Sequence, residues 1–446
     1  MSDILHNKAA KFISLGCKLN FAENSTVCDL MEKRGAHRAA PDELADICII
    51  NTCTVTETAN HKSRQAIHKV IKENPGAFIV VMGCYAQMQA HTLAEMEGVD
   101  LVVGMEHKGR VVDMLEERLQ ERNGLNACLH EAHTTARKDI KTFVPSCSRG
   151  NRTRYFIKIQ DGCDYFCSYC AIPYSRGRSR NGSIESLVKQ AEQAAEEGGK
   201  EIVITGVNIG DFGKSTDERL MDLLRALDRV DGIERFRISS IEPNLLTEEI
   251  IDFCASSRAF MPHFHIPLQS GSDGVLSLMR RKYDTALFQS RIDYIHAAMP
   301  DAFIGVDVIT GTRGETPQLW EESLAFIRQL DVAQLHVFPY SERPGTAALS
   351  IPYRVDEKEK HRRCHALINL SEEKRKAFYQ RFVGSVRTVL TEHAVSRAKG
   401  FTDNYIQVEM PDKDMNPLLR DNRLVKVHLD ALNEKQDAVV GHIVET

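Results

Sequence analysis

Short apolar segments alternate with longer amphipathic segments along most of this chain, which limits the fold to parallel α/β sheets. Between residues 11 and 119 the segments KFISL, DICII, FIVVM and DLVV are predicted strands, and residues 56–73 are a predicted helix. Six further predicted strands follow: YFIKIQ, EIVIT, RFRIS, HFHIP, FIGVDVIT and AQLHVF. Helices separate them, one starting near Ser183 and ending at Gly198. Six βα units are too few for a complete eight-stranded barrel, so we expect an open, partial one.

The last part of the chain has a different pattern. The segments VGSVRTVLTEH, FTDNYIQVEM, RLVKVHLDAL and AVVGHIVE alternate apolar and polar residues, with turn residues between them. This pattern predicts a small antiparallel β-barrel, similar to oligonucleotide-binding barrels. We therefore expect an α/β protein of several domains: a parallel-sheet α/β domain over residues 1–121, a polar linker over 122–150, a partial barrel over 151–380 and the small barrel over 381–446.

Composition limits the compartment and the partners. The 446 residues include twelve cysteines and no apolar run long enough to cross a membrane. Because the N-terminus also lacks the residue order of an export signal, we expect a cytoplasmic protein with no membrane partner. We also expect it to be a monomer. Clustered cysteines in a reducing compartment bind metals more often than they form disulfides. The net charge of −5 means that nucleic-acid binding must come from local basic patches.

Three cysteines lie close together directly after the predicted strand YFIKIQ. Cys163, Cys167 and Cys170 have the spacing C-x3-C-x2-C. Zinc sites usually have four protein ligands from paired C-x2-C hooks, and a [4Fe–4S] cluster usually takes four thiolates. Three thiolates on one loop therefore favour a [4Fe–4S] cluster with one iron left open, at the C-terminal mouth of the predicted barrel. The alternative is a zinc site completed by a distant histidine or cysteine.

Three further cysteines follow three different predicted strands. Cys17 follows KFISL, Cys53 follows DICII and Cys84 follows FIVVM. Since the carboxyl ends of parallel strands meet at one edge of a sheet, we expect these thiols to converge there. Glycines before Cys17 and Cys84 allow close approach to a bulky cluster. A second three-thiolate cluster is the sharper hypothesis, and buried thiols that only pack are the alternative. The other six cysteines are expected to pack or to be incidentally exposed.

The loop of Cys163 resembles the cluster motif of the radical S-adenosylmethionine (SAM) superfamily. Over almost the whole chain, the two three-cysteine sites and the small β-barrel resemble the radical SAM methylthiotransferases, with a methylthiotransferase domain, a partial (β/α)6 TIM-like radical SAM barrel and a TRAM β-barrel. The motifs SLGCKLN, NTCTVT, GCYAQ and QDGC-x3-C-x2-CAIP-x2-RGRSR look most like the MtaB branch. That branch adds methylthio to C2 of N6-threonylcarbamoyladenosine beside the tRNA anticodon.

Three other functions remain open at this point. Two share the chemistry and the architecture: sister branches act on isopentenyladenosine in tRNA and on an aspartate of a ribosomal protein. The third, a two-cluster electron carrier, belongs to another class. Ferredoxins normally provide four thiolates per cluster and need no partial barrel, so this alternative is remote.

The resemblance implies two [4Fe–4S] clusters and SAM as cofactors, with metal-binding and catalytic roles for the six cysteines of the two sites. It implies that one SAM methylates sulfur at the second cluster and that another gives a 5′-deoxyadenosyl radical, which removes the C2 hydrogen of the base. An external electron donor and a sulfur source are implied partners. The family's SAM pocket matches these positions at predicted strand ends: Gly206, Asn208, Ser240, Glu242, Gln269, Ser270, Arg281 and Asp307. Strand-end packing is the alternative for each, and an unusual Thr312-Arg313 leaves the role of Arg313 open.

Basic residues are concentrated around the first cysteine motif. Residues 149–180 hold seven arginines and lysines against two aspartates, a local net charge of +5. We expect a tRNA anticodon loop to pass the mouth of the site and to contact Arg176, Arg178 and Arg180. Cationic and aromatic residues around one turn of the C-terminal barrel favour a second RNA contact: Arg397, Lys399, Phe401 and Tyr405. A solvated charged surface is the alternative for both.

Overall fold

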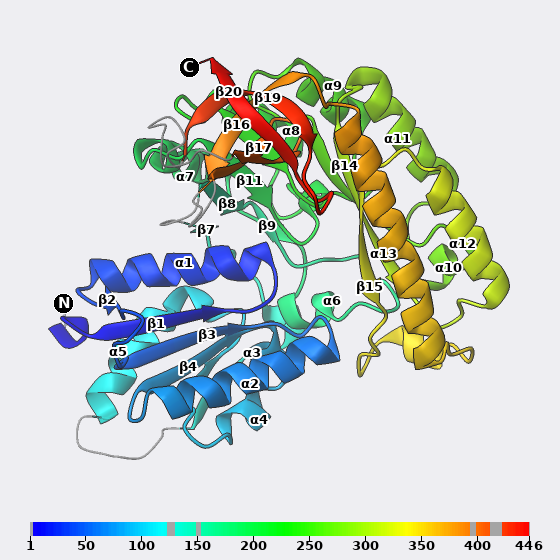
Figure 1. The fold of residues 1–446 in the computed structure, drawn as a ribbon. Helices are drawn as coiled ribbons and strands as arrows, with labels where there is room; N and C mark the ends of the chain where they lie inside the picture. The colour runs from blue at the N-terminus through cyan, green and yellow to red at the C-terminus, as the bar shows by residue number, and fades with distance from the viewer. Residues whose placement is uncertain (1–2, 123–129, 149–152, 393–397, 411–421, 446) are drawn as a thin grey trace.

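The computed structural model describes residues 3–122, 130–148, 153–392, 398–410 and 422–445. They form an N-terminal α/β domain, a partial barrel and a small C-terminal barrel, shown in blue, green to orange, and red in Figure 1. Within these ranges, no helix combines the length and the apolar character that a membrane span needs.

The N-terminal domain is built on six parallel strands in the spatial order β2-β1-β3-β4-β5-β6. The strands are β1 (Ala9–Ser14), β2 (His37–Arg38), β3 (Ile47–Thr52), β4 (Phe78–Gly83), β5 (Leu101–Val103) and β6 (Glu131–His133). The helices are α1 (Lys18–Lys33), α2 (Glu57–Glu73), α3 (Cys84–Met88), α4 (Ala90–Ala94) and α5 (Val111–Arg122). This confirms the predicted parallel-sheet domain.

Helices cover both faces of this sheet. Ile47 of β3 packs in one apolar cluster with Val27 of α1, whereas the next residue, Cys48, packs in another cluster with Ile67 of α2. Successive side chains of a strand point to opposite faces, so a strand buried on both faces is apolar throughout. Because helices cover both faces, polar and reactive residues of this sheet are expected at its carboxyl edge.

The central domain is a partial barrel of six parallel strands. They are β8 (Arg154–Lys158), β11 (Glu201–Thr205), β12 (Arg235–Ile238), β13 (His263–Gln269), β14 (Phe303–Thr310) and β15 (Gln334–Pro339). Parallel ladders join β8, β11 and β12, and a second set joins β13, β14 and β15, with a register shift between Pro267 and Gln269 of β13. Two isolated parallel bridges, Phe236–Phe260 and Ser240–His265, connect the two sets. The predicted six-unit partial barrel is confirmed.

Helices surround this barrel on the outside (Figure 1). They are α7 (Ile184–Glu196), α8 (Leu220–Asp228), α9 (Glu248–Ser256), α10 (Asp273–Leu278), α11 (Thr285–Ala298), α12 (Pro317–Gln329) and α13 (Glu357–Gln380). The predicted helix near Ser183 begins at Ile184, and the Ser183 hydroxyl accepts a hydrogen bond from the amide of Ser186.

Short elements connect the two α/β domains. They are β7 (Ser146–Cys147), β9 (Gln160–Asp161), α6 (Ile172–Arg176) and β10 (Arg180–Asn181). Strand β7 pairs with β8 of the partial barrel, and β6 extends the N-terminal sheet. Residues 122–150, expected to be a linker, thus contribute a short strand to each sheet. The backbone amides and carbonyls of β6 and β7 pair with neighbouring strands. A polar sequence without periodicity does not reveal such pairing.

The C-terminal strands close into a barrel in the order β16-β17-β18-β20-β19. They are β16 (Val386–Glu392), β17 (Ala398–Thr402), β18 (Gln407–Met410), β19 (Leu424–Leu432) and β20 (Val439–Glu445). The predicted antiparallel arrangement is correct for all pairs except β18–β20, which is parallel. Arg237 of β12 donates to the carbonyl oxygens of Thr402 and Asp403, which fixes the small barrel at the amino ends of the partial barrel's strands.

Candidate active site

The loop between β9 and α6 carries the first three cysteines. It is tightly turned, because Gly162 and Phe166 both have positive φ angles, 74° and 50°. Cys163, Cys167 and Cys170 all line the same cavity. Burial raises the pKa of the Cys163 thiol, and the neighbouring Cys170 and Cys167 raise it further. The loop therefore presents three thiols to one cavity, and we call them triad A: Cys163, Cys167 and Cys170.

Each sulfur of triad A accepts a hydrogen bond from a nitrogen. The amide of Tyr165 lies 3.4 Å from Cys163 Sγ, and the amide of Ile172 lies 3.4 Å from Cys170 Sγ. Cys167 Sγ is 3.0 Å from Nη1 of Arg281. Such donors stabilise thiolate ligands and tune the potential of iron–sulfur clusters. The donor set of triad A thus fits an anionic cluster.

A cavity of about 310 Å³ opens beside triad A at the carboxyl ends of the barrel strands. Among the residues that the structure describes, its lining contains no histidine and no fourth cysteine. A zinc site closed by a distant histidine or cysteine is therefore not supported.

Six of the eight predicted SAM positions line this cavity: Asn208, Ser240, Glu242, Gln269, Arg281 and Asp307. The other two do not. A Cβ on Gly206 would lie 2.9 Å from Oε1 of Gln160, so Gly206 packs against that side chain. The hydroxyl of Ser270 is buried and lies 3.4 Å from the hydroxyl of Ser323.

Gln269 shows two features that are typical of a ligand site. Its φ is +67°, a strained value for a residue with a side chain, and it lies at an irregularity in the pairing of β13 with β14. Its Oε1 is buried and has no hydrogen-bond partner in the described part of the chain. An unused buried acceptor is costly unless a ligand supplies a donor. The cavity therefore fits a polar ligand such as the amino-acid part of SAM.

Arg281 connects the cavity to triad A. Its guanidinium forms an ion pair with Glu242 and a 3.0 Å hydrogen bond from Nε to Tyr283 Oη. Burial raises the pKa of Glu242, although the charge of Arg281 opposes this effect. Asp307, across the cavity, lies 2.7 Å from Nε2 of His265. Two acidic side chains with fixed partners therefore face the space beside the cysteines.

The other three predicted cysteines form a second group, triad B, at the carboxyl edge of the N-terminal sheet. Cys17 precedes α1, Cys53 follows β3, and Cys84 is the first residue of α3. Burial raises the pKa of Cys53 to about 12, and the neighbouring Cys84 and Cys17 contribute to the rise. Cys53 and Cys84 are buried whereas Cys17 is exposed, so triad B is accessible on one side.

Two glycines allow the loops of triad B to approach one another. Gly16 has a φ of +98°, and a Cβ there would lie 2.7 Å from Cβ of Cys53. Gly83 has a φ of +109°, and a Cβ there would lie 2.4 Å from the carbonyl oxygen of Thr52. Both positions require glycine for sterics and for backbone conformation. The glycines predicted to admit a cluster thus bring the cysteine-bearing loops together.

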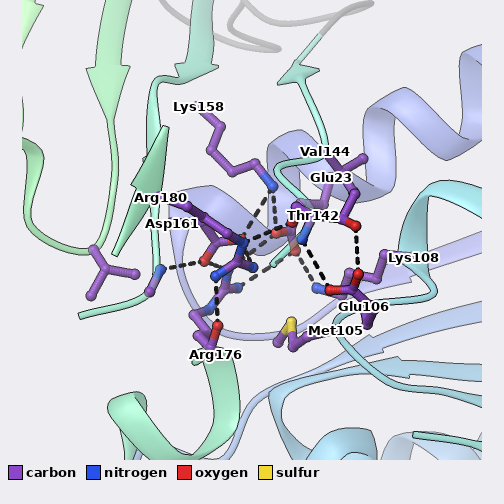
Figure 2. Close-up of polar contacts among 12 residues, drawn as sticks. Glu23, Met105, Glu106, Lys108, Thr142, Val144, Lys158, Asp161, Arg176 and Arg180 are labelled. Atoms are coloured by element: carbon purple, nitrogen blue, oxygen red, sulfur yellow. Dashed lines mark hydrogen bonds and ion pairs between the residues drawn. The ribbon is translucent and has the colours of Figure 1, made fainter. Parts of the chain in front are cut away.

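Two of the three arginines predicted to contact RNA near triad A are buried, which corrects that prediction. Arg176 and Arg180 are 1% and 5% exposed and form ion pairs with Asp161 (Figure 2). Neither guanidinium is available to a phosphate in solvent. The basic segment 149–180 favoured an RNA surface in the sequence. In the structure, its residues Arg176 and Arg180 instead lie at an interface between domains. Arg178, between them, is exposed.

The predicted RNA contacts of the C-terminal barrel also have other partners. Tyr405 Oη lies 2.9 Å from Nη1 of Arg154, whose guanidinium carbon lies 4.5 Å from the centre of the Phe401 ring. These two aromatic residues therefore help to attach the small barrel to the partial barrel. Lys399 forms an ion pair with Glu409. Arg397 lies outside the described residues.

Sequence reasoning did not identify the residues that form the mouth of the cavity. Val55 and Thr56 reach it from the N-terminal domain, and Phe338 and Ser341 reach it from the end of β15. Val55 and Phe338 are each 49% exposed. Phe338, an aromatic residue at the end of a predicted barrel strand, was the available sequence indication of the cavity mouth. Its proximity to Val55 depends on how the two domains pack.

Arg313, whose role was left open, connects two loops beside β15. Its Nε donates to Glu342 at 2.9 Å, and its Nη1 donates to the carbonyl oxygen of Ile351 at 3.1 Å. It does not line the cavity.

Comparison with known families identifies both α/β domains. A model described as "Uncharacterized protein family UPF0004" matches residues 9–104, and the Radical SAM superfamily matches residues 157–327. The chain is 38% identical over 407 residues to the threonylcarbamoyladenosine tRNA methylthiotransferase MtaB of Bacillus subtilis, covering 89% of each. It is 34% identical over 410 residues to the protein of the same name from Aquifex aeolicus, covering 92% of this chain and 98% of that one.

Two more distant comparisons bear on the family and on the fold. The chain is 32% identical over 395 residues to the tRNA-2-methylthio-N(6)-dimethylallyladenosine synthase of Alkaliphilus oremlandii, covering 86% of this chain and 82% of that one. Among solved structures, the radical SAM methyltransferase TsrM of Kitasatospora setae matches with a TM-score of 0.56 at 16% identity, covering 77% of each chain. This structural likeness concerns the fold alone.

Proposed function

The chain belongs to the MtaB family of radical SAM methylthiotransferases, and on that basis we propose that it adds a methylthio group to C2 of N6-threonylcarbamoyladenosine beside the tRNA anticodon. One observation carries the proposal. The cavity beside triad A is also lined by Val55 and Thr56, which directly follow Cys53 and Thr54 of the triad B loop. A base in this cavity would have a radical site on one side and a sulfur-carrying site on the other.

As a radical SAM enzyme, the chain uses an iron–sulfur cluster and SAM. Triad A would hold the cluster, which together with SAM would supply radical chemistry at a carbon–hydrogen bond beyond the reach of acid–base groups. Side chains and backbone amides of the chain orient the sulfurs of triad A. Arg281 donates to Cys167 and is fixed by Glu242, and the amides of Tyr165 and Ile172 donate to the other two sulfurs. Gln269 offers an acceptor for the polar groups of SAM.

A second [4Fe–4S] cluster at triad B is part of the proposal. Support comes from three thiols that follow three neighbouring strand ends, from the close approach of the Cys17 and Cys53 loops at Gly16, and from the hydrogen bond that Arg176 donates to Cys84. A group of thiols that only packed would not require a guanidinium aimed at sulfur, because a neutral thiol is a weak acceptor. The donor set therefore fits an anionic metal group better than packing alone.

The proposed tRNA surface is smaller than the sequence indicated. Exposed cations beside the cysteine loop and the cavity include Arg178, Arg280 and Lys282. Arg280 and Lys282 flank Arg281, which lines the cavity. They can therefore contact phosphates of the tRNA while the base enters the cavity. An external electron donor, an external sulfur source and a monomeric state remain predictions.

Two experiments test this function. The first measures the nucleosides of tRNA from a strain lacking the gene, by mass spectrometry. We expect loss of 2-methylthio-N6-threonylcarbamoyladenosine, with N6-threonylcarbamoyladenosine retained. If the dimethylallyl derivative is lost instead, the substrate belongs to the other branch, represented by the Alkaliphilus relative. Unchanged tRNA would direct attention to a protein substrate.

The second experiment separates the two triads. Cys167→Ala is expected to abolish reductive SAM cleavage, because it removes a ligand of the radical site. Cys53→Ala is expected to retain SAM cleavage but not methylthio transfer. Anaerobic reconstitution of the unmodified protein should give about eight irons per chain, in two cubane clusters. Reversible electron transfer without SAM cleavage would favour an electron carrier and refute the proposal.

A further inference from the structure

A group of buried charges lies between the N-terminal domain and the partial barrel (Figure 2). Each of its side chains is at most 6% exposed. Its members come from both domains: Glu23, Lys108, Lys158, Asp161, Arg176 and Arg180. Buried ions are costly unless they are paired and hydrogen-bonded, so such a group requires a structural or functional reason.

Arg176 lies at the centre of this group and reaches triad B. Its Nη1 donates to Asp161 Oδ1 at 2.8 Å and to Glu23 Oε1 at 3.1 Å. Its Nη2 donates to Asn20 Oδ1 at 2.6 Å, and its Nε donates to Cys84 Sγ at 3.2 Å. All three guanidinium nitrogens are therefore engaged, and the planar fork has a fixed orientation.

The group contains more positive than negative charge. Four cations share two fully buried carboxylates, Glu23 and Asp161, and within the described residues the ion pairs of these cations involve only those two carboxylates. Glu106 lies at the edge of the group, is partly exposed and accepts a hydrogen bond from Thr142. Even with Glu106 included, one positive charge is unmatched. An anionic thiolate group at triad B would balance it.

Helix α6 connects this group to triad A. The amide of Ile172, its first residue, donates to Cys170 Sγ at 3.4 Å, and Arg176 is its last residue. The helix also packs against α3, whose first residue is Cys84. Five residues therefore separate a cysteine of triad A from the arginine that contacts triad B. A motion of one site relative to the other would have to break α6 or the ion pairs of Arg176.

We infer that Arg176 is a positioning residue for the cluster at triad B: it donates to the Cys84 thiolate, supplies the counter-charge of the cluster and, through α6, holds the two triads at a fixed separation. The inference rests on the proposed function, because it requires a cluster at triad B. Hydrogen bonds and positive charge next to a cluster stabilise its reduced form, which carries one more negative charge. Arg176 thus raises the reduction potential of this cluster.

The test uses the full chain with Cys163, Cys167 and Cys170 replaced by alanine, so that reconstituted iron binds only at triad B. In this background, Arg176→Gln is compared with the parent for iron content and for the midpoint reduction potential. We expect about four irons in both and a more negative potential in the variant. Full iron loading with an unchanged potential would overturn the inference.

Arg237→Gln is the matched control. Arg237 is also a buried arginine at a domain interface, paired with Glu201 at 2.9 Å, but it lies in the attachment of the C-terminal barrel. Its substitution is expected to reduce stability without moving the potential of the triad B cluster. An equal shift in both variants would overturn the inference, because the shift would then follow from a general loss of packing.

Two further measurements cover a variant that fails to retain the cluster. Arg176→Lys keeps the charge but lacks the planar fork, so we expect a potential between those of the parent and of Arg176→Gln. In the protein with all six cysteines, Arg176→Gln is expected to lose at most the triad B cluster, from about eight irons to about four, with SAM binding retained. Loss of both clusters would make Arg176 a general folding residue and overturn the inference.

The parent background separates this inference from the proposed function. A parent that binds no iron would refute the cluster at triad B, and the proposed function with it. A parent that binds iron, together with a variant of unchanged potential, would refute only the role of Arg176.

Discussion

At the scale of single residues, an arginine outside each cysteine triad donates a hydrogen bond to one of its sulfurs. Arg281, which follows α10, donates to Cys167, and Arg176, at the end of α6, donates to Cys84. Each arginine is held by a carboxylate, Glu242 or Asp161, so its donors are oriented before any cofactor binds. Pre-oriented donors lower the reorganisation needed when charge appears on the sulfurs.

The cavity gives a prediction for Gln269. Gln269→Leu removes the buried acceptor Oε1 while keeping the size of the side chain. We expect SAM to bind about tenfold to a hundredfold more weakly, since a hydrogen bond to a charged group contributes about 1.5–3 kcal/mol. Iron content is expected to be unchanged. Equilibrium binding of SAM to the reconstituted protein measures the effect.

Ser270→Ala is the control for Gln269→Leu. Ser270 is the next residue, but it does not line the cavity, and its hydroxyl lies near Ser323. We expect SAM affinity to stay within about twofold of the unmodified protein. Equal weakening by both substitutions would mean that the loop's shape, not the acceptor, controls binding.

At the scale of elements, helix starts are encoded locally. The side chains of Thr56, Ser183, Thr247, Thr316 and Asp356 each accept the amide hydrogen three residues later, at the starts of α2, α7, α9, α12 and α13. Such capping compensates for amides that lack a partner in the first turn. The start of α7 was therefore predictable from the sequence around Ser183.

Capping gives a stability prediction. Ser183→Ala is expected to lower the free energy of unfolding by about 1 kcal/mol, because the amide of Ser186 loses its acceptor. Urea denaturation of the iron-free protein measures the change. Ser290→Ala is the control, since Ser290 is exposed inside α11, where alanine favours the helix. A larger loss in the control would contradict the capping argument.

The sequence predicts the long elements and the cysteine sites but not the short connections. Strands such as β3 and β4 are buried on both faces, so their apolar composition identifies them. Strands β6, β7, β9 and β10 have two or three residues and depend on pairing with distant segments. The burial of Arg176 was not predictable either, because its partner Glu23 lies on α1 and only the packing of two domains brings them together.

At the scale of the whole molecule, buried ion pairs connect the two α/β domains. Burial raises the pKa of Glu23, but Arg176, Lys108 and Lys158 outweigh this effect and hold the pKa well below its usual range, even with Asp161 nearby. A carboxyl group whose pKa is lower in the folded state stabilises the fold above its unfolded pKa, about 4.3, and this contribution is lost as the pH falls. The domain interface is therefore acid-sensitive.

Glu23→Gln tests this interface. We expect a loss of about 3–5 kcal/mol in unfolding free energy at pH 7, because buried cations lose a counter-charge. The difference from the unmodified protein should shrink as the pH falls below about 4, where Glu23 of the unfolded chain is already protonated. Denaturant unfolding of the iron-free protein at several pH values measures both effects. A difference that does not change with pH would contradict the assigned role of the carboxylate.

The mouth of the cavity gives the last prediction, because it is formed by both domains. Phe338 from β15 and Val55 from the N-terminal domain are both 49% exposed and line the same cavity. An exposed aromatic ring at such a mouth provides a surface on which a base stacks, worth about 1–3 kcal/mol. Phe338→Ala is therefore expected to lower kcat/KM for tRNA about tenfold or more, while SAM cleavage without tRNA is unchanged. Tyr353→Ala is the control, since Tyr353 is 39% exposed and does not line the cavity. Equal losses in the two variants, or a parallel loss of SAM cleavage, would show that Phe338 does not act through the base.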